Sequence, residues 1–241
     1  DEAIQMEQTE QELFNRMAQS FKIMCDAVNE GKNPNLRSTS GLTGGDAAKM
    51  EKYAQTGGLC GSFLNLAISK AIAVSEYNAS MGKIVAAPTA GSCGILPACI
   101  ISMVESGKCD ESKAIMSLFT AGAFGMVIAQ KASVAGAEGG CQAECGSASA
   151  MAAACLVELA GGTPEQAAHA CAMAIKNQLG LVCDPVAGLV EIPCIKRNVS
   201  GTVIAFSSAE MALAGIESKI PADECIMAMK QVGASLPCSL R

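Results

Sequence analysis

The feature that most limits the fold of this chain is a high content of hydrophobic residues with almost no aromatic side chains among them. Half of the residues are hydrophobic, yet only 3% are aromatic and Trp is absent. The core must therefore be built from Ala, Val, Ile, Leu, Met and Cys. Because the distance between packed helices depends on the side chains at their contact, small residues allow close approach. We therefore expect a compact array of helices.

The periodicity of the apolar residues supports an all-α fold. The first helix is predicted from a spacing of three or four residues and a stop at Gly31, and its apolar positions are Phe14, Met17, Phe21, Met24 and Val28. Further helices are expected over residues 59–77, 111–130 and 163–179, with two more beginning at Asn198 and Pro221. No segment shows the period-two alternation of paired strands. We predict one helical domain over residues 1–241, with its functional loops at helix ends.

Charge and composition exclude several classes of function. A formal net charge of −6 argues against binding to nucleic acid, which depends on Lys and Arg. No basic amphipathic helix indicates a membrane surface. The uncharged stretches 84–104 and 114–130 are interrupted by Gly or Pro, or are too short, for a typical span of about 20 residues. We expect them to be buried helices of a soluble protein.

The cysteine content indicates a reducing compartment. The chain has thirteen cysteines, an odd number, together with a rich hydrophobic core and a polar, acidic N-terminus unlike a signal peptide. Disulfide frameworks belong mainly to small secreted domains. Free thiols and a cytoplasmic location are therefore expected.

Two loops rich in glycine and hydroxyl side chains precede predicted helices. One spans residues 38–46 and the other residues 87–94. Each is either a plain linker, the first ending in Asp46 as a helix cap, or a cradle that binds a carboxylate through hydroxyls and free N–H groups. If they are cradles, the candidate substrate contacts are Ser40, Thr43, Thr89 and Ser92.

Three cysteines, Cys141, Cys183 and Cys194, lie in turn-rich segments outside the helical patterns. They are either buried small hydrophobes or ligands of a metal centre. Their wide spacing fits an iron–sulfur cluster better than a zinc finger. The only histidine, His169, lies within a predicted helix, which argues against a Cys–His nucleophile.

Several sequence runs resemble the α subunit of the iron–sulfur L-serine dehydratases. They are NASMGKIVAAPTAGSCGILPA (78–98), TAGAFG (120–125), GAEGGCQAE (136–144) and LGLVCDPVAGLVEIPCIKRN (179–198). The resemblance implies a helical catalytic domain that converts L-serine to pyruvate and ammonia without pyridoxal phosphate. It also implies a separate β subunit or regulatory domain and an oligomeric assembly.

The resemblance further implies a [4Fe–4S] cluster bound by Cys141, Cys183 and Cys194. With three protein ligands, one iron would remain open to act as a Lewis acid on the substrate. Asn198 joins the four loop hydroxyls as an expected substrate contact, and the general base is not identified. Two alternatives remain: an L-cysteine desulfidase of similar chemistry, or an iron–sulfur redox sensor.

Overall fold

The computed structural model describes residues 8–241, which form helices joined by loops, without a strand. This confirms the all-α prediction. The α-helices are α2 (Glu10–Gly31), α3 (Asp46–Ala54), α4 (Gly61–Ala79), α5 (Ile95–Glu105), α6 (Glu111–Lys131), α7 (Gly136–Gly139), α8 (Ser147–Leu159), α9 (Pro164–Lys176), α10 (Cys194–Leu213) and α11 (Ala222–Ser235). Short helical turns are η1 (Ala90–Ser92), η2 (Gln142–Gly146), η3 (Val186–Gly188) and η4 (Cys238–Leu240).

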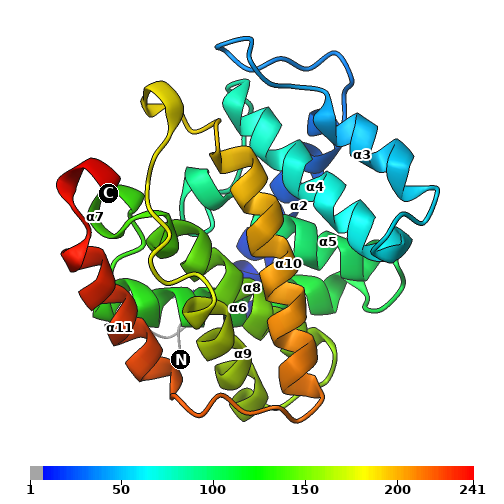
Figure 1. The fold of residues 1–241 in the computed structure, drawn as a ribbon. Coiled ribbons are helices and arrows are strands. Elements are labelled where there is room, and N and C mark those ends of the chain that lie inside the picture. The colour runs from blue at the N-terminus through cyan, green and yellow to red at the C-terminus, as the bar shows by residue number, and fades with distance from the viewer. Residues whose placement is uncertain (1–7) are drawn as a thin grey trace.

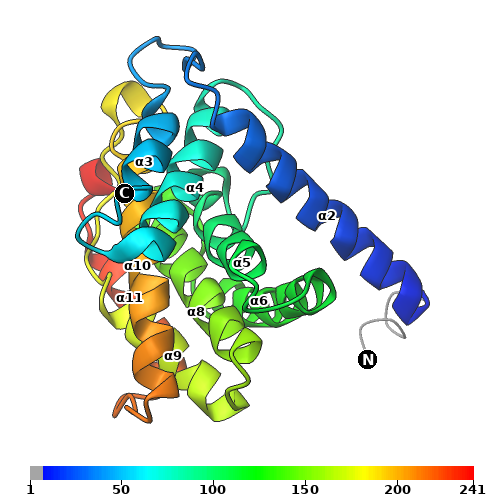
Figure 2. The same cartoon turned by 90° about the vertical axis from the view of Figure 1, so that its right-hand side faces the viewer.

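Helix α8 lies at the centre of the fold (Figure 1) and packs against α5, α6, α9 and α10. Every residue from Ser147 to Val157 is buried, and most of them are Ala or Ser. A helix surrounded on all sides has no polar face, and its small side chains let four neighbours approach it. Figure 2 shows α2 running diagonally along one side of the molecule.

Glycines make some of the helix contacts closer still. A Cβ atom added at Gly31, at the end of α2, would lie 2.0 Å from the Ala73 carbonyl oxygen of α4. One added at Gly201 in α10 would lie 2.4 Å from the Ile95 side chain at the start of α5. Helices with few aromatic residues thus approach each other closely, and larger residues at Gly31 and Gly201 would prevent these contacts.

By length and composition, α6 is the one helix in the described part of the chain that could cross a membrane. It packs against α2, α5, α8 and α11. Only 33% of its most apolar window is buried, and its outer side exposes Met116, Met126 and Val127. The predicted helix is therefore confirmed, although it covers the core from one side and is not enclosed by it.

The helix expected from Asn198 begins four residues earlier, at Cys194, so that prediction was wrong. The backbone N–H groups of Ile195 and Arg197 donate to the carbonyl oxygens of Glu191 and Pro193, which closes the first turn. Cys141 likewise directly precedes η2, which continues into α8. Of the three turn-region cysteines, only Cys183 remains in a loop, and the other two lie at helix starts.

Candidate functional site

Three segments distant in sequence meet around the cysteines. The Gln142 N–H donates to the Leu181 carbonyl oxygen at 3.0 Å. The Arg197 guanidinium donates to the Val182 carbonyl at 2.9 Å and pairs with Asp184 at 2.7 Å. These contacts place the start of η2, the loop with Cys183 and the first turn of α10 side by side.

Cys141 is the thiol most easily deprotonated among the three. It lies 3.4 Å, sulfur to sulfur, from the fully buried Cys145. A hydrogen bond from the Cys145 thiol and the positive charge of Arg197 lower the pKa of Cys141, although burial acts in the opposite direction. The same pairing, together with burial, raises the pKa of Cys145. Of this pair, Cys141 is thus the thiol that loses its proton more readily.

Cys183 and Cys194 lie in the two segments that Arg197 joins, and the first of these segments also contacts the start of η2. Burial raises the pKa of Cys183, and the charges of Glu144 and Cys141 add to the increase. Burial raises the pKa of Cys194 to about 11, with further contributions from the charges of Cys141, Glu144 and Cys183. The fold therefore brings together the three segments that carry the predicted cysteines, with Glu144 three residues after Cys141.

The three thiols do not form a site for a single metal ion. Within residues 8–241, no three His, Cys, Asp or Glu side chains are close enough to hold a single metal ion. Cysteine ligands of a multi-iron cluster bind different irons, so they are further apart than the ligands of one ion. Three cysteine side chains beside a guanidinium are chemically suited to such a cluster.

Glu144 lies between the cysteines and the loop 87–94. Its Oε1 accepts a hydrogen bond from Thr89 Oγ1 at 3.0 Å, and it also accepts one from the Gly136 backbone N–H. Burial raises the pKa of Glu144, and these two hydrogen bonds only partly offset the increase. Glu144 was not predicted from the sequence, although an acidic side chain between Cys141 and Cys145 was a visible signal.

Asn198 joins the loop 87–94 to α10. Its Oδ1 accepts from the Gly94 N–H at 2.9 Å, and its Nδ2 donates to the carbonyl oxygens of Gly91 and Cys194 at 2.8 and 2.9 Å. Both amide N–H groups are therefore used by the backbone. Ser92 is fully buried and its Oγ lies 3.2 Å from Thr89 Oγ1.

The hydroxyls of the loop 38–46 bind a carboxylate of this same chain. Ser40 donates to Glu191 Oε2 at 2.6 Å, and Thr43 donates to Glu191 Oε1. Burial acts to raise the pKa of Glu191, but hydrogen bonds from Ser38, Ser40 and Thr43 outweigh it and lower the pKa overall. Glu191 was not predicted, although it is the only charged residue between Asp184 and Lys196.

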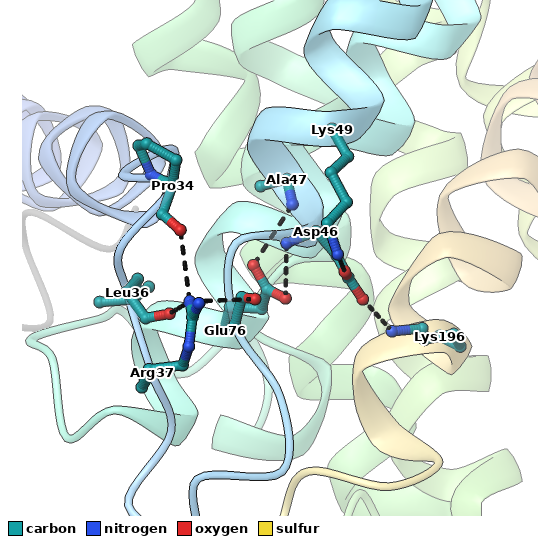
Figure 3. Close-up of polar contacts among 9 residues, drawn as sticks. Pro34, Leu36, Arg37, Asp46, Ala47, Lys49, Glu76 and Lys196 are labelled. Carbon is teal, nitrogen blue, oxygen red and sulfur yellow. Dashed lines mark hydrogen bonds and ion pairs between the residues drawn. The ribbon is translucent and has the colours of Figure 1, made fainter.

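The backbone N–H groups at the end of the same loop bind a second internal carboxylate (Figure 3). Glu76, 1% exposed, accepts from the N–H groups of Asp46 and Ala47 at 3.2 and 3.3 Å. Burial raises the pKa of Glu76 despite these two hydrogen bonds. The expected cap by Asp46 was wrong: Gly45 is the cap residue, and the Asp46 side chain instead pairs with Lys49 and Lys196, each at 2.8 Å.

A groove of about 320 Å³ separates the two hydroxyl-rich loops. Ser40 and Ala90 line it from opposite loops, and Leu189 and Glu191 line it from the segment before Cys194. Thr43, Thr89, Ser92 and Asn198 do not line this groove. The structure thus brings the two loops together, as the sequence suggested, but only one of the five predicted substrate contacts faces the space between them.

His169 lies away from this region, on α9. Its Nδ1 accepts a hydrogen bond from the Ser218 backbone N–H at 3.2 Å. This contact ties α9 to the segment before α11, which agrees with a scaffold role.

Comparison with known proteins adds a family match. The serine dehydratase alpha chain family matches residues 1–241. A probable L-serine dehydratase alpha chain of Bacillus subtilis (strain 168) is 52% identical over 236 residues, which cover 98% of this chain and 78% of that protein. The L-serine dehydratase alpha chain of Peptoniphilus asaccharolyticus is 48% identical over 234 residues, covering 97% and 80%. L-serine dehydratase 1 of Escherichia coli (strain K12) is 43% identical over 176 residues, covering 71% and 38%.

Proposed function

The chain belongs to the serine dehydratase alpha-chain family, and from this we propose that it converts L-serine to pyruvate and ammonia with the aid of a [4Fe–4S] cluster. The observation that carries the proposal is the contact between the three separate segments that carry Cys141, Cys183 and Cys194. Incidental core cysteines have no reason to gather beside a guanidinium and a carboxylate.

Cys141, Cys183 and Cys194 would hold the cluster as thiolates. When bound, the cluster would supply a Lewis acid at the iron that has no protein thiolate. Arg197 offsets the negative charge of the thiolates and holds the Cys183 loop through Val182 and Asp184. The cluster ligands would thus be positioned by a charged residue that belongs to the same helix as Cys194.

The loop 38–46 would bind the substrate carboxylate. Support comes from Ser40 and Thr43, whose hydroxyls already hold the carboxylate of Glu191. We propose that the substrate carboxylate takes the place of Glu191, which opens the groove beside Ala90. Asn198, with its amide used by the backbone, would position the loop 87–94 and would not contact the substrate.

Replacing Glu191 by Gln should lower the KM for L-serine. Hydrogen bonds to a charged acceptor contribute about 1.5–3 kcal/mol, compared with about 0.5–1.5 kcal/mol for neutral pairs. If the hydrogen bonds from Ser40 and Thr43 to residue 191 weaken by about 1 kcal/mol, this side chain competes less with the substrate carboxylate. The KM for L-serine then falls roughly fivefold. Steady-state kinetics would measure this, with Ser40→Ala as the opposing variant that raises KM. An unchanged KM with reduced kcat would show that Glu191 only anchors the loop.

The assembly proposed for the protein includes a second chain. The relatives from Bacillus subtilis and Peptoniphilus asaccharolyticus are named alpha chains, which supports a separate β subunit for this protein too.

All thirteen cysteines are free thiols, which supports the proposal of a reducing, cytoplasmic compartment.

The function is tested on anaerobically purified protein, with its β subunit supplied. We expect a brown protein with about four irons per chain that releases pyruvate from L-serine. Mössbauer spectra should change at one iron when L-serine is added. Sulfide release from L-cysteine without serine turnover would identify a desulfidase, and a cluster that responds only to oxidants would identify a sensor. Iron-free protein that binds zinc would overturn the proposal.

A further inference from the structure

We infer that Glu144 is the general base that removes the α-proton of L-serine. The inference rests on the proposed function and extends it to a residue that neither the motifs nor the family comparison assigns. The Glu144 carboxylate lies three residues after Cys141 and accepts a hydrogen bond from Thr89 of the loop 87–94.

The other titratable groups around the thiols are already engaged. Asp184 forms an ion pair with Arg197 at 2.7 Å, and Glu191, held by Ser40 and Thr43, is the group that the substrate carboxylate would replace. Lys196 is paired with Asp46 at 2.8 Å. The single histidine of the chain is on α9, in contact with Ser218. Glu144 has no cationic partner among residues 8–241.

The chain reserves space for the Glu144 carboxylate. A Cβ atom at Gly91 would lie 2.9 Å from its Oε2, and a Cβ atom at Gly136 would lie 2.7 Å from the same oxygen. The donors that hold the carboxylate are one hydroxyl, from Thr89, and one backbone N–H, from Gly136. A carboxylate has about four acceptor sites, so it remains free to accept a proton. Two neutral donors orient it without neutralising its charge.

Glu144 takes the proton from Cα of L-serine and becomes a neutral carboxylic acid. The electron pair of the broken Cα–H bond forms the Cα=Cβ double bond, and the Cβ–O bond breaks with its electron pair leaving on the hydroxyl oxygen. The products are 2-aminoacrylate and, after Glu144 returns its proton to the hydroxide, water. Hydrolysis of 2-aminoacrylate then gives pyruvate and ammonia.

The decisive variant is Glu144→Gln in the holoenzyme. The amide oxygen can accept from the Gly136 N–H and the amide nitrogen can donate to the Thr89 hydroxyl, so the fold of the site is retained. Loss of a general base lowers kcat by roughly 100- to 10,000-fold. We expect this loss with an unchanged iron content and with the serine-induced Mössbauer change intact, because the substrate still binds.

Two further variants separate a base from a structural carboxylate. Glu144→Ala leaves a cavity that formate can enter, and formate should restore part of the activity. Glu138→Gln, an exposed glutamate of the same segment, should turn over serine like the wild type. Wild-type protein that fails to deaminate serine would overturn the proposed function itself. If the wild type turns over serine, three results would overturn the inference. Glu144→Gln could keep a kcat within tenfold of wild type, or it could lose its cluster. Formate could also fail to restore activity to Glu144→Ala.

Discussion

Replacing Cys141, Cys183 or Cys194 by Ala will remove iron binding and serine turnover together, whereas Cys155→Ala and Cys171→Ala will leave both in place. The first three thiols converge near Arg197 and Glu144. Cys155 and Cys171 are fully buried in α8 and α9, and burial raises the pKa of each to about 12. Both side chains are enclosed by the hydrophobic core, so these two residues are unsuited to be ligands.

Iron analysis, the visible absorption of the cluster and pyruvate formation measure this prediction on one preparation of each variant. We expect the three site variants to lose cluster and activity to the same extent. Cys145→Ala is the most informative neighbour, because its sulfur lies 3.4 Å from that of Cys141. Equal behaviour of all variants, core and site, would contradict the assignment of the ligands.

Asn198→Ala will lower the free energy of unfolding by roughly 3 kcal/mol. The change removes three hydrogen bonds, to Gly94, Gly91 and Cys194. It also leaves the buried Gly94 N–H without its partner, and an unsatisfied buried group costs about 1–3 kcal/mol. Because Asn198 ties the loop 87–94 to the first turn of α10, the variant should also bind its cluster less tightly.

Urea denaturation of wild-type and variant protein, followed by circular dichroism under anaerobic conditions, would measure the loss. Ser200→Ala is the matched control, since Ser200 is an exposed residue on the same helix and exposed substitutions typically change stability by no more than about 0.5 kcal/mol. A destabilisation below about 1 kcal/mol in Asn198→Ala would show that the loop is held by other contacts.

Local patterns predicted the helices well, for physical reasons that operate over a few residues. The capping box at Thr163 and Gln166 and the proline after Thr163 set the start of α9. The apolar spacing in α2 placed its buried residues, among them Phe21, Met24 and Val28, on one face. The start of α10 was misplaced because its first turn is closed by carbonyl groups of the preceding loop, and the apolar pattern does not show them.

The same distinction between local sequence patterns and long-range contacts applies to the candidate site. By itself the sequence determined an all-α fold, the two hydroxyl-rich loops and the three thiols, because residue type and short-range spacing carry that information. Only the tertiary structure decided what those groups face. Glu191 reaches Ser40 across 151 residues and Thr89 reaches Glu144 across 55, and loops have no period from which such pairs can be read. Long-range packing of small-residue helices therefore determines which carboxylate occupies each cradle.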